Sequence, residues 1–302
     1  MHVENEKHQI GILGSSGLIG CAFLDGFQKS APICLGRSSA QNRFLDLSKI
    51  TDKNVFKGID VLIHAAGITE EGLKADPEGT FWRAGYGAQT LFENAAVSGV
   101  KTIVYISSAH VYGAFKGTIN EENPSLPVND YGGCHLLTER LLYRISKEYG
   151  IRVLVVRPNA VFGTSFNPEK FTRWHLVPFL FPKIALETGK IVINSPHTIR
   201  NFISTHSIFK KAQTFLENNQ TPDFYILNPV GPDTLTILNF AEMCAQKIEE
   251  ITGKSVDLQV KSSADIDTFR YATLHTAEPE ISNLPQFLSD YINLLTNNMR
   301  AR

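Results

Sequence analysis

Five short apolar runs in the first half of the chain limit its fold more than any other feature. Bounded by Gly, Pro or Ser, they lie at 8–14, 32–36, 60–67, 101–108 and 151–158. Because they are nearly all apolar rather than alternating, they predict strands covered on both faces, as in a parallel sheet between helix layers. Helical patterns separate the runs at about 18–29, 78–98 and 130–149. This alternation predicts an α/β fold with a doubly wound parallel sheet.

The pattern changes after Pro158. Residues 159–200 are rich in Phe, Pro and Asn, and the later predicted elements are helices at 205–218 and 234–252 and a short strand at 224–228. We therefore expect residues 1–158 to form the main sheet domain. Residues 159–302 should form mainly a smaller, partly interleaved lobe, some of whose segments return to the sheet.

Composition narrows the classes of function. The chain has 302 residues, 43% of them hydrophobic and 20% charged, which is enough for a large core. Its 29 Lys and Arg balance 30 Asp and Glu, so no overall field would steer it to nucleic acid or to an anionic membrane. No apolar run approaches the roughly 18 residues of a membrane helix. The polar start, MHVENEKHQI, lacks a signal-peptide core, so we expect a cytoplasmic protein.

The cysteines carry no pattern typical of a disulfide framework or of a metal site. They are scattered at Cys21, Cys34, Cys134 and Cys244, without CxxC or Cys/His spacing. We expect four reduced thiols and no metal ion.

The segment GILGSSGLIG, residues 11–20, follows a strand run and opens a helix. Its glycines have the spacing of a Rossmann-type dinucleotide site, in which one glycine permits the turn, one lets a pyrophosphate approach the backbone and one lets the helix pack closely. The pyrophosphate then lies at the helix N-terminus. We expect the cofactor to contact Gly14, Ser16, Gly17, Leu18 and Ile19.

The second strand bears on the choice of dinucleotide. An NAD site usually ends this strand with an acid that binds the ribose hydroxyl, whereas here Gly36 and Arg37 follow one another. The guanidinium of Arg37 suits a 2′-phosphate, which favours NADP and leaves NAD as the alternative. Further cofactor contacts are expected at Asp46 and at the end of the 60–67 strand, from Ala65, Ala66 and Gly67.

Several linked motifs identify a family. They are GSSGLIG, DVLIHAAG, LFENAAVSGVKTIVYISSAHVYG (91–113), YGGCHLLTE (131–139), RPNAVFG (157–163) and RNFIS (200–204). The chain resembles the extended short-chain dehydrogenases/reductases, a group of NAD(P)-dependent sugar-nucleotide epimerases, dehydratases and reductases. The resemblance implies that Ser108 hydrogen-bonds the substrate oxygen and that Tyr131 is the acid/base. Chemistry agrees, since oxidation or reduction at a carbinol carbon moves a proton on its oxygen.

The main departure from the family pattern is at residue 135. The usual Tyr-x-x-x-Lys has become Tyr131-x-x-x-His135, which still keeps both side chains on one helix face and near the cofactor ribose. A lysine 4 Å from a phenolate would contribute about 4 kcal/mol at an effective dielectric of about 20, or roughly three pKa units. Three alternatives remain: His135 becomes an imidazolium, the tyrosine is less activated, or catalysis has been lost.

Other departures concern the sugar side. Ala84, Ala160 and Asn201 replace an Asn, an Asn and an Asp that the family pattern leads one to expect. The resemblance still implies substrate contacts at Asn159 and from Arg200, whose donors suit a diphosphate. His110 lies where dehydratases of this family carry acidic groups, and it either contacts the substrate or is an ordinary polar residue at a strand end.

These observations favour an NADP(H)-dependent oxidoreductase acting on a nucleotide-activated sugar, most simply a 4-keto-6-deoxy sugar reductase. One alternative is a nucleotide-sugar 4-epimerase that retains NAD. A second is a non-catalytic NADP-binding protein, because the usual lysine is His135. Helices at 78–98 and 130–149 often form a dimer interface in this family, so a homodimer is possible.

Overall fold

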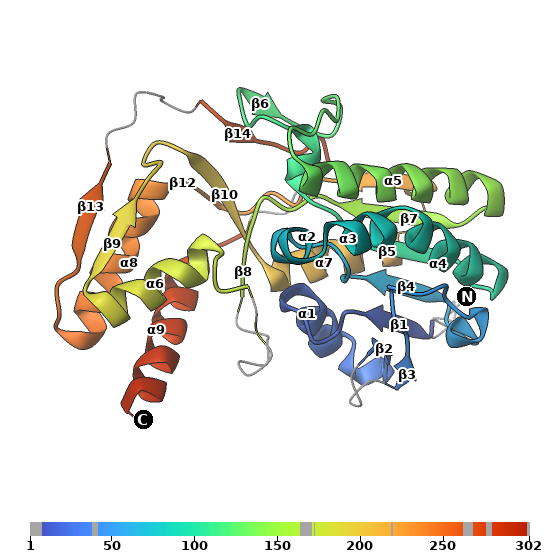
Figure 1. Cartoon of the computed structure of the whole chain (residues 1–302), viewed down its shortest axis with the longest axis horizontal. Coiled ribbons are helices and arrows are strands. Elements are labelled where there is room, and N and C mark those ends of the chain that lie inside the picture. The colour runs from blue at the N-terminus through green and yellow to red at the C-terminus, as the bar shows by residue number, and fades with distance from the viewer. Residues whose placement is uncertain are drawn as a thin grey trace, which may run out of the picture.

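The computed structural model describes residues 8–37, 42–163, 171, 173–218, 220–261, 268–275 and 280–300. Its centre is a seven-stranded sheet in the order β11-β7-β5-β4-β1-β2-β3, in which every paired strand is parallel. The strands are β1 (Ile10–Leu13), β2 (Ile33–Gly36), β3 (Arg43–Phe44), β4 (Val61–His64), β5 (Thr102–Ile106), β7 (Arg152–Val156) and β11 (Phe224–Leu227). Figure 1 shows helices on both sides of this sheet. The predicted doubly wound fold is confirmed.

Each face of the sheet has its own apolar core, because neighbouring residues of a strand point to opposite faces. On one face Leu13 packs with residues of α4 (Tyr86–Val97) and α5 (Asp130–Tyr149). On the other, Ile12 packs with residues of α1 (Leu18–Gly26) and α7 (Thr205–Glu217). The four strands in the middle of the sheet are buried on both faces, as their apolar composition predicts; they are β7, β5, β4 and β1.

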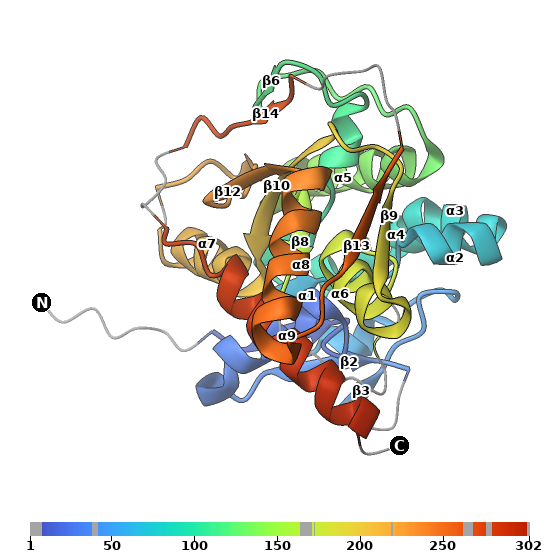
Figure 2. The same cartoon turned by 90° about the vertical axis from the view of Figure 1, so that its left-hand side faces the viewer.

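The second half of the chain forms a smaller lobe, which lies to the left of the sheet domain in Figure 1 and faces the viewer in Figure 2. Its helices are α6 (Val177–Thr188), α8 (Ile237–Thr252) and α9 (Leu284–Arg300). Its small sheets pair β12 (Asp233–Thr236), β10 (Ile199–Ser204) and β8 (Ala160–Phe162), and β13 (Asp257–Val260) with β9 (Lys190–Ile193). Its core is rich in aromatic side chains, among them Phe162, Phe179, Phe202, Phe240 and Tyr291.

The lobe and the sheet domain are interleaved. After β10 the chain returns to the main domain, where α7 packs on α1 and β11 adds the seventh strand beside β7. A short pair, β6 (Thr118–Ile119) with β14 (Arg270–Tyr271), also joins distant parts of the chain. Later segments thus take part in the main sheet, while the division of the chain at residue 158 stays a prediction.

The helix expected at 78–98 is interrupted. It consists of α3 (Pro77–Ala84) and α4, because Gly85 has φ −102° and ψ −105°, far from helical values. The shorter α2 (Glu70–Ala75) precedes them. The predicted helix at 234–252 begins only at Ile237, since the residues before it form β12. Two helices of the lobe were not predicted, α6, where Pro178 and Pro182 obscure the pattern, and α9.

No helix within the described ranges is both long and apolar enough to cross a membrane. Cys34, Cys134 and Cys244 are buried free thiols, and Cys21 is a partly exposed one, as expected. The described residues contain no group of three or more His, Cys, Asp or Glu side chains that could hold a metal ion.

Candidate active site

The glycine-rich turn has the geometry that its sequence predicts. Gly14 has φ +92°, and a Cβ there would lie 2.8 Å from the Ala65 carbonyl oxygen and from the Ala66 Cβ. At Gly20 an added Cβ would lie only 1.9 Å from the Gly14 carbonyl oxygen, so α1 packs directly against the turn. The N-terminus of α1, at Gly17, has no side-chain cap. Its backbone N–H groups therefore suit an anion.

The other predicted residues of this turn divide into two kinds. Ser16 and Gly17 are exposed. The side chain of Leu18 is buried in the core of the lobe, and that of Ile19 packs against the core beneath α7. Leu18 and Ile19 can therefore offer a ligand their backbone N–H groups, whereas their side chains join the two parts of the protein.

The end of β4 lies beside the turn. The N–H of Ala65 donates to the Leu13 carbonyl oxygen over 2.9 Å, and Gly67 has φ +107°. Ala66 and Gly67 line a small cavity of about 10 Å³ together with Leu47, His64, Ile68, Arg83, Tyr105 and Thr138. The structure thus brings the predicted residues Ala65 to Gly67 together with the glycine-rich turn.

The residues that bear on whether NADP or NAD binds lie after β2. Arg37 is exposed directly after that strand. Asp46 accepts hydrogen bonds from the N–H and hydroxyl of Ser48 at 3.0 and 2.8 Å, and these bonds, followed by the charge of Arg37, lower its pKa. Arg43, the next arginine along the chain, donates to the Val55 and Lys57 carbonyl oxygens, both at 2.8 Å. An acid therefore lies within electrostatic reach of Arg37.

Ser108 and Tyr131 come together at the carboxyl end of β5. Ser108 is buried and begins the short helix Ala109–Tyr112, where its Oγ accepts from the His110 N–H at 3.2 Å. Tyr131 lies in the first turn of α5, which Asn129 caps by accepting from the Gly132 N–H at 2.8 Å. Burial raises the pKa of Tyr131, while the charge of Arg173 and hydrogen bonding with Ser108 and with Arg173 lower it. The short helix that Ser108 caps also lies beside Tyr131, whose ring centroid is 5.5 Å from that of His110.

His135 lies beneath Tyr131, with ring centroids 4.7 Å apart. It is only 4% exposed, and its Nδ1 is 2.7 Å from the Tyr105 hydroxyl. Burial, followed by the positive charge of Arg173, lowers the pKa of His135 to about 3. Of the three alternatives for this position, the structure thus disfavours an imidazolium. The Nε2 atom is buried and has no hydrogen-bond partner within the described part of the chain.

Arg173 and Tyr105 were not predicted as site residues from the sequence. Tyr105 belongs to an apolar strand, in which a tyrosine is ordinary. Arg173 lies before α6, outside every motif, and its charge was the only signal that it carried. The charge of Arg173 nonetheless acts on Tyr131, whose pKa it lowers.

The other three predicted substrate contacts, His110, Asn159 and Arg200, differ in their surroundings. The ring of His110 packs against Tyr131, with centroids 5.5 Å apart, and burial lowers the His110 pKa. Arg200 lies over the Phe115 ring at 5.1 Å, and its charge also lowers the His110 pKa. Asn159 accepts from the Asn201 N–H at 3.0 Å, and its buried Nδ2 has no partner among the described residues. His110 therefore lies against Tyr131, Arg200 acts on His110, and Asn159 fastens β10.

A buried ion pair connects the elements that carry the site. Arg157 donates from Nε and Nη2 to the two carboxylate oxygens of Glu139, at 3.0 and 2.6 Å. Ser107, beside the predicted catalytic serine, donates to the same carboxylate at 2.5 Å. Glu139 thus ties α5 to the ends of β5 and β7.

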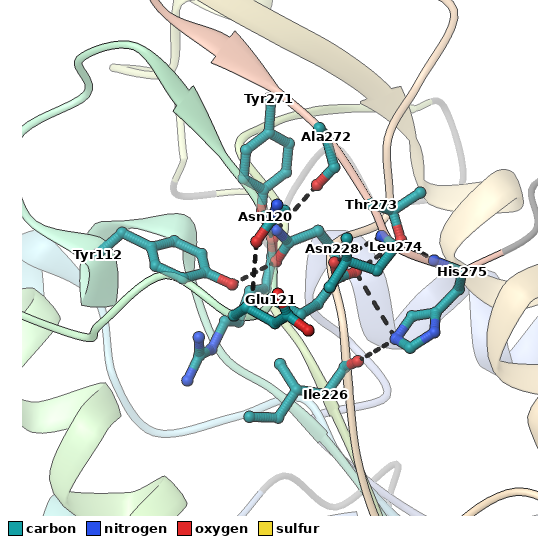
Figure 3. A network of polar contacts seen from close by, with 12 residues as sticks. Tyr112, Asn120, Glu121, Ile226, Asn228, Tyr271, Ala272, Thr273, Leu274 and His275 are labelled. Atoms are coloured by element: carbon teal, nitrogen blue, oxygen red, sulfur yellow. Dashed lines mark hydrogen bonds and ion pairs between the residues drawn. The ribbon is translucent and has the colours of Figure 1, made fainter.

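A second network, drawn in Figure 3, fastens the loop after Ser108 to later segments. The Tyr112 hydroxyl donates to Asn228 Oδ1 at 2.8 Å, and the Asn228 N–H donates to Glu121 at 2.8 Å. Glu121 also accepts from the Thr273 hydroxyl at 2.6 Å and the Leu274 N–H at 2.9 Å. This network therefore has a structural role, joining the site loop to β11 and to the segment after β14.

A further pocket, of about 660 Å³, is lined by residues of α7 and by segments near β11, with His206, Lys210, Lys211, Tyr225, His275 and Glu280 among them. None of the residues predicted to bind cofactor or substrate lines this pocket.

The sheet order, the glycine-rich turn and the serine–tyrosine pair together define the short-chain dehydrogenase/reductase class of protein. Within that class, the chain belongs to the NAD dependent epimerase/dehydratase family, whose family model matches residues 10–225. The family predicted from the motifs is thus confirmed.

Several relatives are similar in sequence. A UDP-glucose 4-epimerase from Lacticaseibacillus casei is 32% identical over 220 residues, which cover 66% of this chain and 63% of the relative. A dTDP-D-glucose 4,6-dehydratase from Mus musculus is 23% identical over 65% of this chain and 54% of its own length. The match therefore spans less than two thirds of each of these relatives.

Solved structures share the fold. A UDP-N-acetylglucosamine 4-epimerase from Methanobrevibacter ruminantium, in complex with UDP-N-acetylmuramic acid, has a TM-score of 0.81 at 19% identity and covers 97% of this chain and 99% of that one. A UDP-glucuronic acid 4-epimerase from Bacillus cereus, in complex with UDP-glucuronic acid and NAD, has a TM-score of 0.76 at 21% identity and covers 95% and 99%. The names of these relatives and solved structures favour the epimerase alternative over the reductase expected from the sequence.

Proposed function

We propose that this protein is a nucleotide-sugar 4-epimerase that keeps a nicotinamide dinucleotide bound. The observation that carries the proposal is the pairing of Tyr131 with Ser108 at the sheet edge where the glycine-rich turn also ends. The epimerases among the relatives support this reaction, and the expected sugar-nucleotide reductase becomes the competing function. The UDP-sugars in the titles of related structures make a UDP-sugar the first substrate to test.

The residues present fit a dinucleotide. The start of α1 has no side-chain cap, and Gly17 there is exposed and has no side chain, so a phosphate can approach the backbone N–H groups. The buried Nε2 of His135 lacks a partner within the described ranges, and a ribose hydroxyl would satisfy it. NAD fits the proposal, while Arg37 keeps NADP as the alternative.

The chain's own residues supply the acid–base chemistry. Tyr131, as phenolate, accepts the proton of the sugar hydroxyl during oxidation and returns it to the same oxygen during reduction. Ser108 orients that oxygen by a hydrogen bond, and Arg200 binds the substrate diphosphate. A bound nicotinamide supplies the hydride acceptor and donor. Rotation of the oxidised sugar between the two steps inverts its configuration.

The test begins with the purified protein. It is denatured, and any released dinucleotide is identified by mass spectrometry. The native protein is then incubated with UDP-glucose, UDP-N-acetylglucosamine and UDP-glucuronic acid, and the 4-epimers are followed by NMR. Epimer formation without net change in nicotinamide absorbance supports the proposal. Stoichiometric oxidation of added NADPH by a keto-sugar nucleotide would identify a reductase instead.

A second candidate, a non-catalytic dinucleotide-binding protein, is favoured by one observation. With its pKa near 3, His135 is neutral and supplies no charge to Tyr131 at neutral pH. Tight binding of NAD or NADP without turnover of any sugar nucleotide would support this candidate.

A further inference from the structure

His135 leaves one polar atom without a partner beneath the candidate site. The side chain is only 4% exposed, and its Nε2 is buried with no hydrogen-bond partner among the described residues. Buried polar atoms nearly always have a partner, so an orphaned one points to a group that binds there. Burial lowers the pKa of His135 to about 3, so at neutral pH the ring carries a single proton. Nε2 is a donor or an acceptor according to which nitrogen holds that proton.

The other ring nitrogen of His135 is bound by Tyr105. The Nδ1 atom lies 2.7 Å from the Tyr105 hydroxyl, and the ring centroids are 5.9 Å apart. Tyr105 is 1% exposed, and burial raises its pKa well above the usual value, so the hydroxyl keeps its proton. A distance of 2.7 Å is typical of an O–H donor, whereas N–H donors usually lie about 2.9 to 3.0 Å from an oxygen. The hydroxyl therefore donates to Nδ1.

The opposite arrangement of protons is chemically weaker. In it Nδ1 would donate to Tyr105, and Tyr105 would donate onward to the hydroxyl of Thr138, another neighbour. Thr138 itself donates to the carbonyl oxygens of Ala84 and Cys134, at 3.0 and 3.1 Å. An imidazole nitrogen, with a pKa of about 6.5, is a far stronger base than a hydroxyl oxygen. The Tyr105 proton therefore belongs in the bond to Nδ1, which leaves the proton of the neutral imidazole on Nε2.

The Tyr105–His135 pair lies beside the residues that are predicted to bind the cofactor. Tyr105 lines the small cavity that Ala66 and Gly67, at the end of β4, also line. His135 contacts the ring of Tyr131, with centroids 4.7 Å apart. The pair therefore adjoins both the expected cofactor site and the expected acid/base.

We propose that Tyr105 is a positioning residue that fixes His135 in the tautomer with its proton on Nε2, and that this N–H donates to a ribose hydroxyl of the bound dinucleotide. The inference rests on the dinucleotide binding that the proposed function includes. A lysine at this position would offer hydrogen bonds together with a charge. His135 offers the hydrogen bond alone, and Tyr105 determines which of its nitrogens is the donor.

Nuclear magnetic resonance identifies the tautomer directly and needs no sugar. The ring nitrogens of the histidines are isotopically labelled, and long-range proton–nitrogen correlation spectra at neutral pH distinguish a protonated from an unprotonated nitrogen. The His135 signals are assigned by nuclear Overhauser contacts with the rings of Tyr105 and Tyr131. The protein should show a protonated Nε2 and an unprotonated Nδ1. The opposite tautomer, or an imidazolium, would overturn the inference.

Tyr105→Phe tests the positioning role. This change keeps the ring and removes the hydroxyl, so the His135 Nδ1 signal should move to that of a nitrogen without a donor, and the other tautomer should become populated. Tyr143→Phe is the matched control, because Tyr143 is an exposed tyrosine on α5, and its spectrum should equal that of the parent. An unaltered His135 spectrum in Tyr105→Phe would show that Tyr105 does not position the ring.

The contact with the cofactor is measured by adding NAD to protein that has been freed of any retained dinucleotide. On saturation the Nε2 proton of His135 should shift downfield, because it gains an acceptor. His135→Leu removes the donor and should weaken NAD binding by about threefold to tenfold, as calorimetry measures it. His135→Gln, whose amide can donate from a similar place, should recover most of the affinity. An Nε2 proton unmoved by NAD, or equal affinity in His135→Leu, would contradict the proposal.

The outcome is separable from that of the proposed function. The predicted tautomer and NAD contact in a protein that turns over no sugar nucleotide would support the role of Tyr105 and contradict the epimerase. Epimerisation by a protein whose His135 carries its proton on Nδ1 would support the epimerase and overturn the inference.

Discussion

The His135 Nδ1 lies 2.7 Å from the Tyr105 hydroxyl, so the residue at the family's lysine position is bound to the sheet by a buried hydrogen bond. Burial raises the pKa of Tyr105 well above its usual value, so this hydroxyl keeps its proton. The pair is uncharged, whereas the lysine pattern would place a cation there. Position 135 has therefore become part of the neutral core beneath the site.

The neutral state of His135 predicts how stability depends on pH. Its pKa falls from 6.5 in the unfolded chain to about 3 in the folded protein, so below pH 6.5 the unfolded chain binds a proton that the folded protein does not. The contribution of the neutral His135 to the free energy of unfolding is fully present above pH 6.5. It is lost as pH falls toward 3, by up to about 1.4 kcal/mol per pH unit. His64, with its pKa lowered to about 4 by burial, acts in the same direction.

The measurement is urea unfolding between pH 5 and 6.5. His135→Gln should reduce the slope of the free energy of unfolding against pH by up to about 1.4 kcal/mol per pH unit, which corresponds to one proton. An equal slope in His135→Gln and the parent would mean that His135 is protonated in the folded protein.

Tyr131→Phe should lower the rate of epimerisation by about 10²-fold to 10⁴-fold, because the phenyl ring cannot move a proton. Dinucleotide binding should remain, as measured by calorimetry. Tyr143→Phe is the control, since Tyr143 lies on the same helix but is 47% exposed. Equal activity of Tyr131→Phe and the parent would assign the proton transfer to another group.

Local signals account for the parts of the fold that the sequence predicted. The central strands were found because both of their faces are buried, and α5 was predicted at 130–149 with its observed bounds. Its ends are marked by the Asn129 cap and by Gly150, which has φ +66°. The break at Gly85 could not be predicted, because a glycine inside a helical pattern is compatible with either a continuous or a broken helix.

The candidate site was predictable where the chain supplies it in motifs. The glycine-rich turn follows β1, Ser108 follows β5 and Tyr131 begins α5, and each lies within one short motif, so short segments carried the signal. Arg173, which lies just before α6 of the lobe, lowers the pKa of Tyr131 in α5. That influence depends on the tertiary packing of two distant segments, which spacing along the chain does not reveal.

Two helical glycines should respond in opposite ways to alanine. Gly20→Ala places a Cβ 1.9 Å from the Gly14 carbonyl oxygen, so α1 must move away from the turn. This variant should lose stability and dinucleotide affinity, the latter by more than about tenfold. Gly133→Ala, with nothing within 4 Å of its Cβ, should gain up to about 1 kcal/mol of stability. Thermal unfolding and NAD titration of both variants check this difference.

Breaking the buried ion pair of Glu139 and Arg157 should lower the free energy of unfolding far more than breaking an exposed ion pair. Glu139→Gln leaves the guanidinium buried without its charge partner, and about 3 to 5 kcal/mol of stability should be lost. Glu148→Gln breaks an exposed pair with Arg144, at 2.6 Å, and should cost below about 0.5 kcal/mol. Chemical denaturation measures both, and similar small losses would show that the buried pair is dispensable.

Replacing Arg37 tests whether the protein prefers NADP or NAD. If its guanidinium binds a 2′-phosphate, Arg37→Ala should weaken NADP by about 10-fold to 100-fold and leave NAD nearly unchanged, because a charge-assisted hydrogen bond is worth about 1.5 to 3 kcal/mol. Asp46, which lies within the field of Arg37, would oppose the same phosphate, so Asp46→Asn should strengthen NADP. Calorimetric titration of both variants with both dinucleotides gives the comparison. Equal small effects on NAD and NADP would place the 2′-position away from Arg37 and would leave NAD as the natural cofactor.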